Sequence, residues 1–307
     1  MNYTPPYKIT SKIVNLISKI SEEMTKIELN KLNLITPKLR KINRIKTIAG
    51  TLEIEGNFLG EEKITAIIEG KRVLATYEEI LEVEGAIEAY KSFEKYDYKK
   101  IDDLLLAHKL MMGGLLKSAG RFREVNVAVG GKDGVSHVAP KPSMVPKLME
   151  QLFEWLEKSD EHPLIKSSVF HYEFEFIHPF SDGNGRIGRL WQSLILYSWK
   201  KEFIAIPTES IVRDNQSRYY QAIEKSSEIG KSTPFIEFML EVIFDAIKSS
   251  VKSSAVSSVN TEGKILSLLK QNPRYTIKEL SNISNLKNKD RLKRVGSARK
   301  GYWEIKE

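Results

Sequence analysis

The chain of 307 residues contains no cysteine, which excludes a disulfide framework and a thiolate metal site. It also lacks a run of about 18 apolar residues, the length that a membrane-spanning helix needs. Its N-terminus shows no charged segment followed by an apolar one, as a secretory signal would. We therefore expect a cytoplasmic protein with no membrane partner. The hydrophobic content of 41% is ordinary for a globular protein with a sizeable core.

The most informative stretch runs from residue 177 to residue 191 and reads IHPFSDGNGRIGRLW. Apolar residues recur at helical spacing in its second half, so a glycine-rich turn precedes a helix with one buried face. The first amides of such a helix attract anions. Gly183 and Gly185 let the backbone approach a ligand closely. Arg186 and Arg189 add forked donors that suit phosphate oxygens.

Two further residues of this stretch suggest chemistry rather than binding alone. Asp182 offers a hard oxygen ligand beside the anion site, which suits Mg2+ held between a carboxylate and phosphates. Histidine side chains titrate near neutral pH, so His178 is a candidate general base. Each residue taken alone is more often structural. Their order and density indicate nucleotidyl or phosphoryl transfer.

Residues 178–189 match the motif HPFx[DE]GNGRxxR at every specified position, and the chain therefore resembles the Fic-domain proteins. The resemblance implies a Fic-type helical bundle that transfers AMP from ATP to a hydroxyl group of a target protein, or of itself. The intact glycine-rich part favours AMP transfer over the phosphate transfer of related kinases. The implied roles are a general base at His178, a Mg2+ ligand at Asp182, an inner-phosphate anion hole at Gly183, Asn184 and Gly185, and outer-phosphate ligands at Arg186 and Arg189.

A second, shorter match lies near the N-terminus. On pattern alone, Glu55 is an acidic residue near a helix end, followed by a glycine that caps it. Thr51, Glu55 and Gly56 also fit the family motif [ST]xxxE[GN], which implies the subclass with an N-terminal inhibitory helix. A carboxylate at Glu55 would pair with Arg189 and withhold it from the outer phosphate of ATP. We therefore expect an autoinhibited enzyme.

Two other segments resemble parts of the family. Val125, Val127 and Val129 alternate with smaller or polar residues, and a glycine-rich turn follows, which predicts a β-hairpin over 125–138. The resemblance makes this hairpin the flap on which a target protein docks by strand addition; the alternative is an ordinary surface hairpin. Tyr220 belongs to a segment that resembles the family's adenosine pocket, although tyrosines in such helices are core about as often.

The C-terminal part has a different composition. Residues 248–260 are rich in serine and predict a linker. Residues 260–307 contain 12 Lys or Arg against 5 Asp or Glu, so they account for most of the net charge of +8. Short helical periods and a strand–turn–strand pattern predict a winged helix-turn-helix-like module over 261–307. Its basic surface makes DNA a possible partner; the alternative is a module for protein contacts or homodimer formation.

The predicted organisation is thus mainly α-helical, with an N-terminal region with the inhibitory helix at 1–100 and a Fic catalytic core at 101–247. Two rival functions stay open at this point. The same site could remove AMP, with Glu55 orienting water, because adding and removing AMP need the same phosphate cradle. The chain could also be a DNA-binding regulator whose Fic core senses a nucleotide, although sensing does not need the base His178. The target and its acceptor residue are not predictable from the sequence.

Overall fold

The computed structural model describes residues 3–29, 37–131, 134–251, 292–295 and 302–305. The chain divides into two compact units, residues 1–250 and 251–307. The finer four-part division expected from the sequence stays a prediction.

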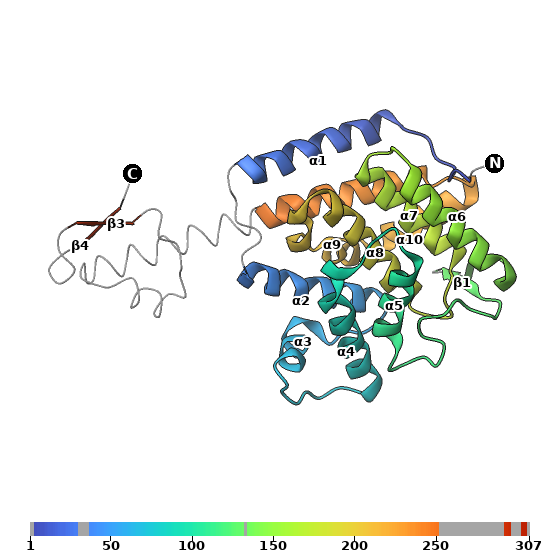
Figure 1. Cartoon of the computed structure of the whole chain (residues 1–307), viewed down its shortest axis with the longest axis horizontal. Coiled ribbons are helices and arrows are strands. Elements are labelled where there is room, and N and C mark those ends of the chain that lie inside the picture. The colour runs from blue at the N-terminus through green and yellow to red at the C-terminus, as the bar shows by residue number, and fades with distance from the viewer. Residues whose placement is uncertain (1–2, 30–36, 132–133, 252–291, 296–301, 306–307) are drawn as a thin grey trace. The chain divides into compact units, whose positions relative to one another are not determined.

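The first unit is a bundle of helices with one small hairpin (Figure 1). Figure 1 shows α8 within the bundle, among the other helices. The α-helices are α1 (Ser11–Leu29), α2 (Pro37–Ile54), α3 (Gly60–Ile68), α4 (Tyr77–Lys91), α5 (Ile101–Met112), α6 (Val145–Lys158), α7 (Pro163–Ile177), α8 (Asn184–Trp199), α9 (Thr208–Asp214), α10 (Gln216–Ile229) and a last helix over 233–251. Short 3-10 turns lie at Phe93–Lys95, Pro142–Met144 and Lys201–Ala205.

Some of the helices begin at side-chain caps that the sequence supplies. The hydroxyl of Thr10 accepts a hydrogen bond from the amide of Ile13 at 3.2 Å and caps α1. At α4, Thr76 and Glu79 form a reciprocal capping box. Such caps satisfy amides that have no partner inside the helix.

The centre of the core lies between α7 and α8. Trp191 of α8 is fully buried, as are Phe170 and Phe174 of α7. The apolar face predicted for the motif helix is therefore buried as expected. The ring of Phe180, in the loop between the two helices, is buried as well. The loop that carries the motif is thus anchored to the core on both sides.

The hairpin is shorter than the alternating valines suggest. Strand β1 (Ala128–Gly131) pairs antiparallel with β2 (Gly134–Val138), and the register shifts between Val129 and Gly130. Residues 125–127 lie outside the strand, because the carbonyl of Val125 is bound by Arg123 instead of by a neighbouring strand. The role of the hairpin as a flap stays a prediction. The paired residues are Ala128 with Val138, Val129 with His137, Gly130 with Val135 and Gly131 with Gly134.

In the second unit the structure describes one antiparallel pair, β3 (Leu292–Val295) and β4 (Tyr302–Ile305). The helices of the predicted winged-helix module lie outside the described residues, as does the predicted DNA surface apart from these strands. Of the predicted linker, residues 248–251 belong to the last helix, and residues 252–260 lie outside the described ranges. No helix in the described ranges is long and apolar enough to cross a membrane.

Candidate functional site

The motif loop turns sharply between α7 and α8. His178 ends α7 in the left-handed conformation, with a φ of 50°, and its amide donates to the carbonyl of Phe174 at 2.9 Å. It is the one non-glycine residue with positive φ in the described part of the chain. Such a conformation is strained, so the surroundings must hold it. The buried side chain of Asn184 helps, because it accepts from the amide of Phe180 and donates to its carbonyl, both at 2.9 Å.

A buried histidine supports the same loop from α5. The ring of His108 stacks on Phe180, with 3.6 Å between ring centroids. Its Nδ1 accepts from the amide of Gly120 at 2.8 Å. Its Nε2 therefore carries the hydrogen that it donates to the carbonyl of Asp182 at 3.0 Å. Burial lowers the pKa of His108 to about 4, so the ring is neutral at physiological pH.

Arg123 connects the hairpin to the motif loop. Its side chain is 3% exposed and donates to the carbonyl of His178 at 2.7 Å and to that of Ile177 at 3.3 Å. It also donates to the carbonyls of Val125, before β1, and Pro140, after β2, at 2.9 and 2.5 Å. One buried guanidinium thus fixes both ends of the hairpin against the backbone of the predicted base.

The predicted pairing of Glu55 with Arg189 is present. Nη2 of Arg189 lies 2.5 Å from Oε1 of Glu55 and 3.2 Å from the carbonyl of Thr51, and Nε donates to the Thr51 hydroxyl at 3.0 Å. The arginine side chain is only 2% exposed, whereas that of Glu55 is 29% exposed. A Cβ on Gly185 would lie 2.5 Å from Oε1 of Glu55, so the glycine permits this approach.

The electrostatics of Arg189 depend on that contact. Burial acts to lower the pKa of Arg189, but the charge of Glu55, the hydrogen bond to it, and the nearby Tyr219 and Glu175 together raise the pKa. On α7, burial raises the pKa of Glu175 to about 8, against the lowering effect of Arg189. Its Oε1 has no hydrogen-bond partner among the described residues, and Oε2 lies 3.9 Å from Nδ1 of His178. A carboxyl with a raised pKa therefore lies near both the predicted base and Arg189.

The other motif arginine is held by a second glutamate. Nη1 of Arg186 lies 2.9 Å from Oε1 of Glu82 on α4, and the arginine side chain is 4% exposed. The second oxygen of Glu82 accepts from the side chain of Asn57 at 2.9 Å. Asn57 follows the Glu55-Gly56 pair directly. Both motif arginines are thus tied to the segment around Glu55, one directly and one through Glu82.

Asp182 can supply the single carboxylate predicted for Mg2+. Its Oδ1 accepts from the amide of Gly183 at 2.6 Å, and its Oδ2 lies 3.3 Å from Nη2 of Arg186. The side chain is 57% exposed beside the start of α8. In the described part of the chain, no three His, Asp or Glu side chains gather as a metal site. The residues present fit a metal whose remaining ligands are phosphates and water.

The two tyrosines of α10 differ in their surroundings. Tyr219 is buried and its hydroxyl lies 3.1 Å from Nε2 of His171, so it belongs to the core. Tyr220 is only partly buried and packs against the core cluster of α7, α10 and the last helix. Its pKa is raised by burial and by the charge of Glu55. Tyr220 therefore lies near Glu55, and its contact with adenosine stays a prediction.

The structure thus gathers His178, Asp182, both arginines and Glu55 around one end of α8. Sequence reasoning missed Arg123, Glu82 and Glu175. Of these three, only Glu175 could have been found from the sequence, because it lies in the last turn of α7, one helical turn before His178. Arg123 and Glu82 act on residues 55 and 104 positions away, and their residue types are ordinary on helical surfaces.

Comparison with known proteins identifies the class. Residues 98–196 match the Fic/DOC family. A Fic family protein of known structure from Desulfovibrio desulfuricans is 38% identical, with a TM-score of 0.78, and the match covers 99% of this chain and 98% of the other. The chain therefore belongs to the Fic/DOC family.

Curated relatives carry the name protein adenylyltransferase Fic. The Culex quinquefasciatus protein is 29% identical over 208 residues, which is 64% of this chain and 39% of that protein. The Nematostella vectensis protein is 29% identical over 221 residues, or 68% of this chain and 49% of that protein. The chain spans less than half the length of these relatives.

Because His108 is buried and neutral, we expect the stability of the fold to depend on pH through this residue. Its pKa of about 4 lies below the ordinary value of 6.5, so the unfolded chain binds a proton there that the folded chain does not. Its contribution to stability is therefore present above pH 6.5 and falls as the pH is lowered towards 4. We expect the difference in unfolding free energy between wild type and His108→Gln to shrink by roughly 1–2 kcal/mol between pH 7 and pH 5.

Denaturant unfolding at both pH values measures this difference directly. The pKa values of buried Glu173 and Glu175 are raised, to about 7 and about 8, so their contributions to the unfolding free energy increase as the pH is lowered, opposite to that of His108. Comparison of wild type with the His108→Gln variant cancels these contributions. A difference that stays constant between pH 7 and pH 5 would contradict the neutral, buried state of His108.

Proposed function

We propose that this protein transfers AMP from ATP to a hydroxyl group of a target protein or of itself. The observation that carries the proposal is the placement of His178 and the start of α8 at the two ends of one rigid loop. A nucleophile activated by the histidine would then face a phosphate held by the helix amides and by Arg186 and Arg189. The name protein adenylyltransferase, which relatives carry, supports this reading.

The proposed reaction is a substitution at the α-phosphorus. His178 accepts the proton of the acceptor hydroxyl, and the oxygen forms a bond to the α-phosphorus. The bond to the bridging oxygen of the β-phosphate breaks, and pyrophosphate leaves. Amides at Gly183, Asn184 and Gly185 stabilise charge on the inner phosphates. Asp182 would hold Mg2+, which would supply positive charge to the phosphates. Tyr220 is the proposed contact of the adenosine.

We further propose that Glu55 holds the enzyme in an inhibited state. A buried guanidinium cannot be left without an anionic partner at low cost. The outer phosphate of ATP must therefore replace Glu55 at Arg189, and it fails to do so while Thr51 and Glu55 keep the arginine. ATP then binds with its α-phosphate misaligned for attack. The hairpin, fixed by Arg123, is the proposed docking edge for the target's acceptor segment.

Glu55→Gly should increase AMP transfer by roughly tenfold to a hundredfold, because misplacement by about 1 Å costs about a hundredfold in rate. The measurement is incorporation of label from α-labelled ATP with Mg2+, scored on the protein itself and on added proteins. Adding His178→Ala to Glu55→Gly should remove most of this gain, since general-base catalysis contributes about 10²- to 10⁴-fold.

Thermal unfolding of each variant shows whether the fold is kept. Unchanged labelling in a folded Glu55→Gly protein would reject autoinhibition by this residue. Labelling of Glu55→Gly/His178→Ala that equals the labelling of Glu55→Gly would reject the proposed base. No label on any variant, with release of AMP from a pre-adenylylated protein instead, would favour the rival activity of AMP removal.

Glu82 should orient Arg186 for its phosphate. Glu82→Gln keeps the shape and the contact with Asn57 but removes the charge that pairs with a buried arginine. In the Glu55→Gly background we expect the KM for ATP to rise by about tenfold, with a smaller change in kcat. Glu79→Gln is the matched control, because Glu79 lies on the same helix and caps it without contacting the motif. Equal KM values in the two variants would refute the role of Glu82.

A further inference from the structure

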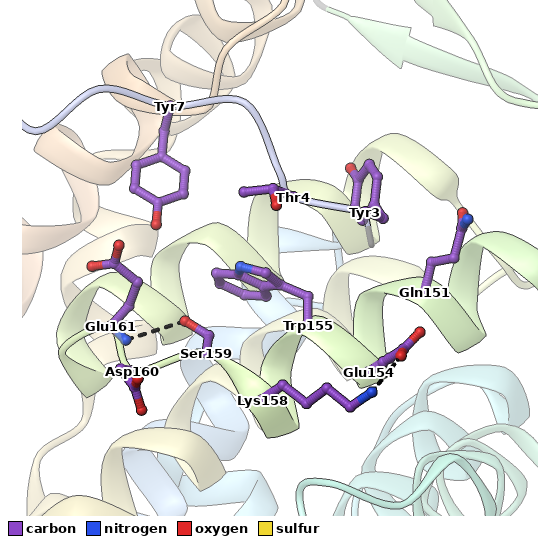
Figure 2. Close-up of a pocket in the computed structure, with 10 residues that line it drawn as sticks. All are labelled: Tyr3, Thr4, Tyr7, Gln151, Glu154, Trp155, Lys158, Ser159, Asp160 and Glu161. Atoms are coloured by element: carbon purple, nitrogen blue, oxygen red, sulfur yellow. Dashed lines mark hydrogen bonds and ion pairs between the residues drawn. The ribbon is translucent and has the colours of Figure 1, made fainter. Parts of the chain in front are cut away.

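A separate cavity lies where the N-terminal arm crosses α6 and the turn into α7 (Figure 2). Its volume is about 450 Å³, within the range of small-ligand sites. The arm is fixed in place, because the carbonyl of Pro6 accepts from the amide of Ser232 at 2.9 Å and the amide of Lys8 donates to the Thr233 hydroxyl at 2.8 Å. None of the motif residues lines this cavity.

Three aromatic side chains form much of its wall: Tyr3 and Tyr7 from the arm and Trp155 from α6. Figure 2 shows the indole between the two tyrosine rings. The hydroxyl of Tyr3 donates to the carboxylate of Glu173 at 2.6 Å. The hydroxyl of Tyr7 lies near Glu161; burial, with this carboxylate beside it, raises the pKa of Tyr7. The hydrogen bond to Glu173 holds the ring of Tyr3 in place as a wall of the cavity.

The charges along the cavity are predominantly negative. Glu154 is paired with Lys158 at 2.6 Å, so these two cancel. Asp160 and Glu161 also line the cavity and have no ion pair with a described cation. Lys166 lies in their field, but its ammonium group donates to the carbonyl of Leu156 at 3.4 Å. Two carboxylates that form no ion pair with a described cation, and that have the ammonium group of Lys166 in their neighbourhood, are therefore next to three aromatic rings.

We propose that this cavity binds a small organic cation of the quaternary or alkylated ammonium class. The faces of aromatic rings carry negative potential and attract such cations, which lose little hydration on binding. The carboxylates of Asp160 and Glu161 supply the opposite charge, and their attraction strengthens in a partly enclosed cavity. An anion or an uncharged apolar ligand of the same size lacks this complementarity.

The test uses the full chain and isothermal titration with choline chloride at constant chloride concentration. The comparison ligand is 3,3-dimethylbutan-1-ol, which has the shape of choline without its charge. We expect saturable binding of choline and at least about tenfold weaker binding of the neutral alcohol. Asp160→Asn with Glu161→Gln should weaken choline binding by about tenfold or more.

Matched variants separate the cavity from general charge effects. Glu157→Gln removes the same charge from an exposed position on α6 that does not line the cavity, and it should bind choline as wild type does. Tyr7→Phe keeps the ring and should retain binding, whereas Tyr7→Leu should lose it. Absence of saturable choline binding, equal affinity for the neutral alcohol, or unchanged affinity in the Asp160→Asn/Glu161→Gln protein would overturn the proposal.

Discussion

The architecture of the site depends on one buried charge, the guanidinium of Arg189. It is 2% exposed, and removing its anionic partner would leave a charge in a medium that solvates it poorly. Glu55 lies at the rim and can return to water, while Arg189 cannot. Separation of the pair would therefore cost more free energy at Arg189 than at Glu55. A phosphate that reaches the same place would satisfy the arginine as well as the glutamate does, so the pair suits an exchange of one anion for another.

Around this exchangeable contact the motif loop is held firmly. His108 stacks on Phe180 and is hydrogen-bonded to the carbonyl of Asp182. The side chain of Asn184 forms two hydrogen bonds with the backbone of Phe180 in the same loop. Arg123 binds the carbonyl of His178, whose backbone is in the left-handed region. These contacts compensate for the strain of that conformation. The structure thus combines a firmly held loop that carries the proposed base with a carboxylate, Glu55, that we propose to be replaceable and to control the arginine.

The sequence predicted the parts of the site that are local in the chain. Residues 178–189 contain the loop and the helix start within one short stretch, and Glu55 belongs to a short motif of its own. Arg123 and Glu82 could not be found in this way, because their roles arise only when α4, the segment before the hairpin and the motif loop pack together. The strand predicted from Val125 begins only at Ala128, since the guanidinium of Arg123, two residues earlier in the chain, binds the carbonyl of Val125 and overrides the alternating pattern.

The most direct measurement compares nucleotide affinity with and without Glu55, in the His178→Ala background so that no turnover occurs. Dissociation constants for ATP and for AMP are determined for His178→Ala and for Glu55→Gly/His178→Ala. If Glu55 acts by occupying Arg189, its removal should tighten the binding of ATP, which carries outer phosphates, and leave that of AMP unchanged. An equal change for both nucleotides, or no change for either, would contradict the account.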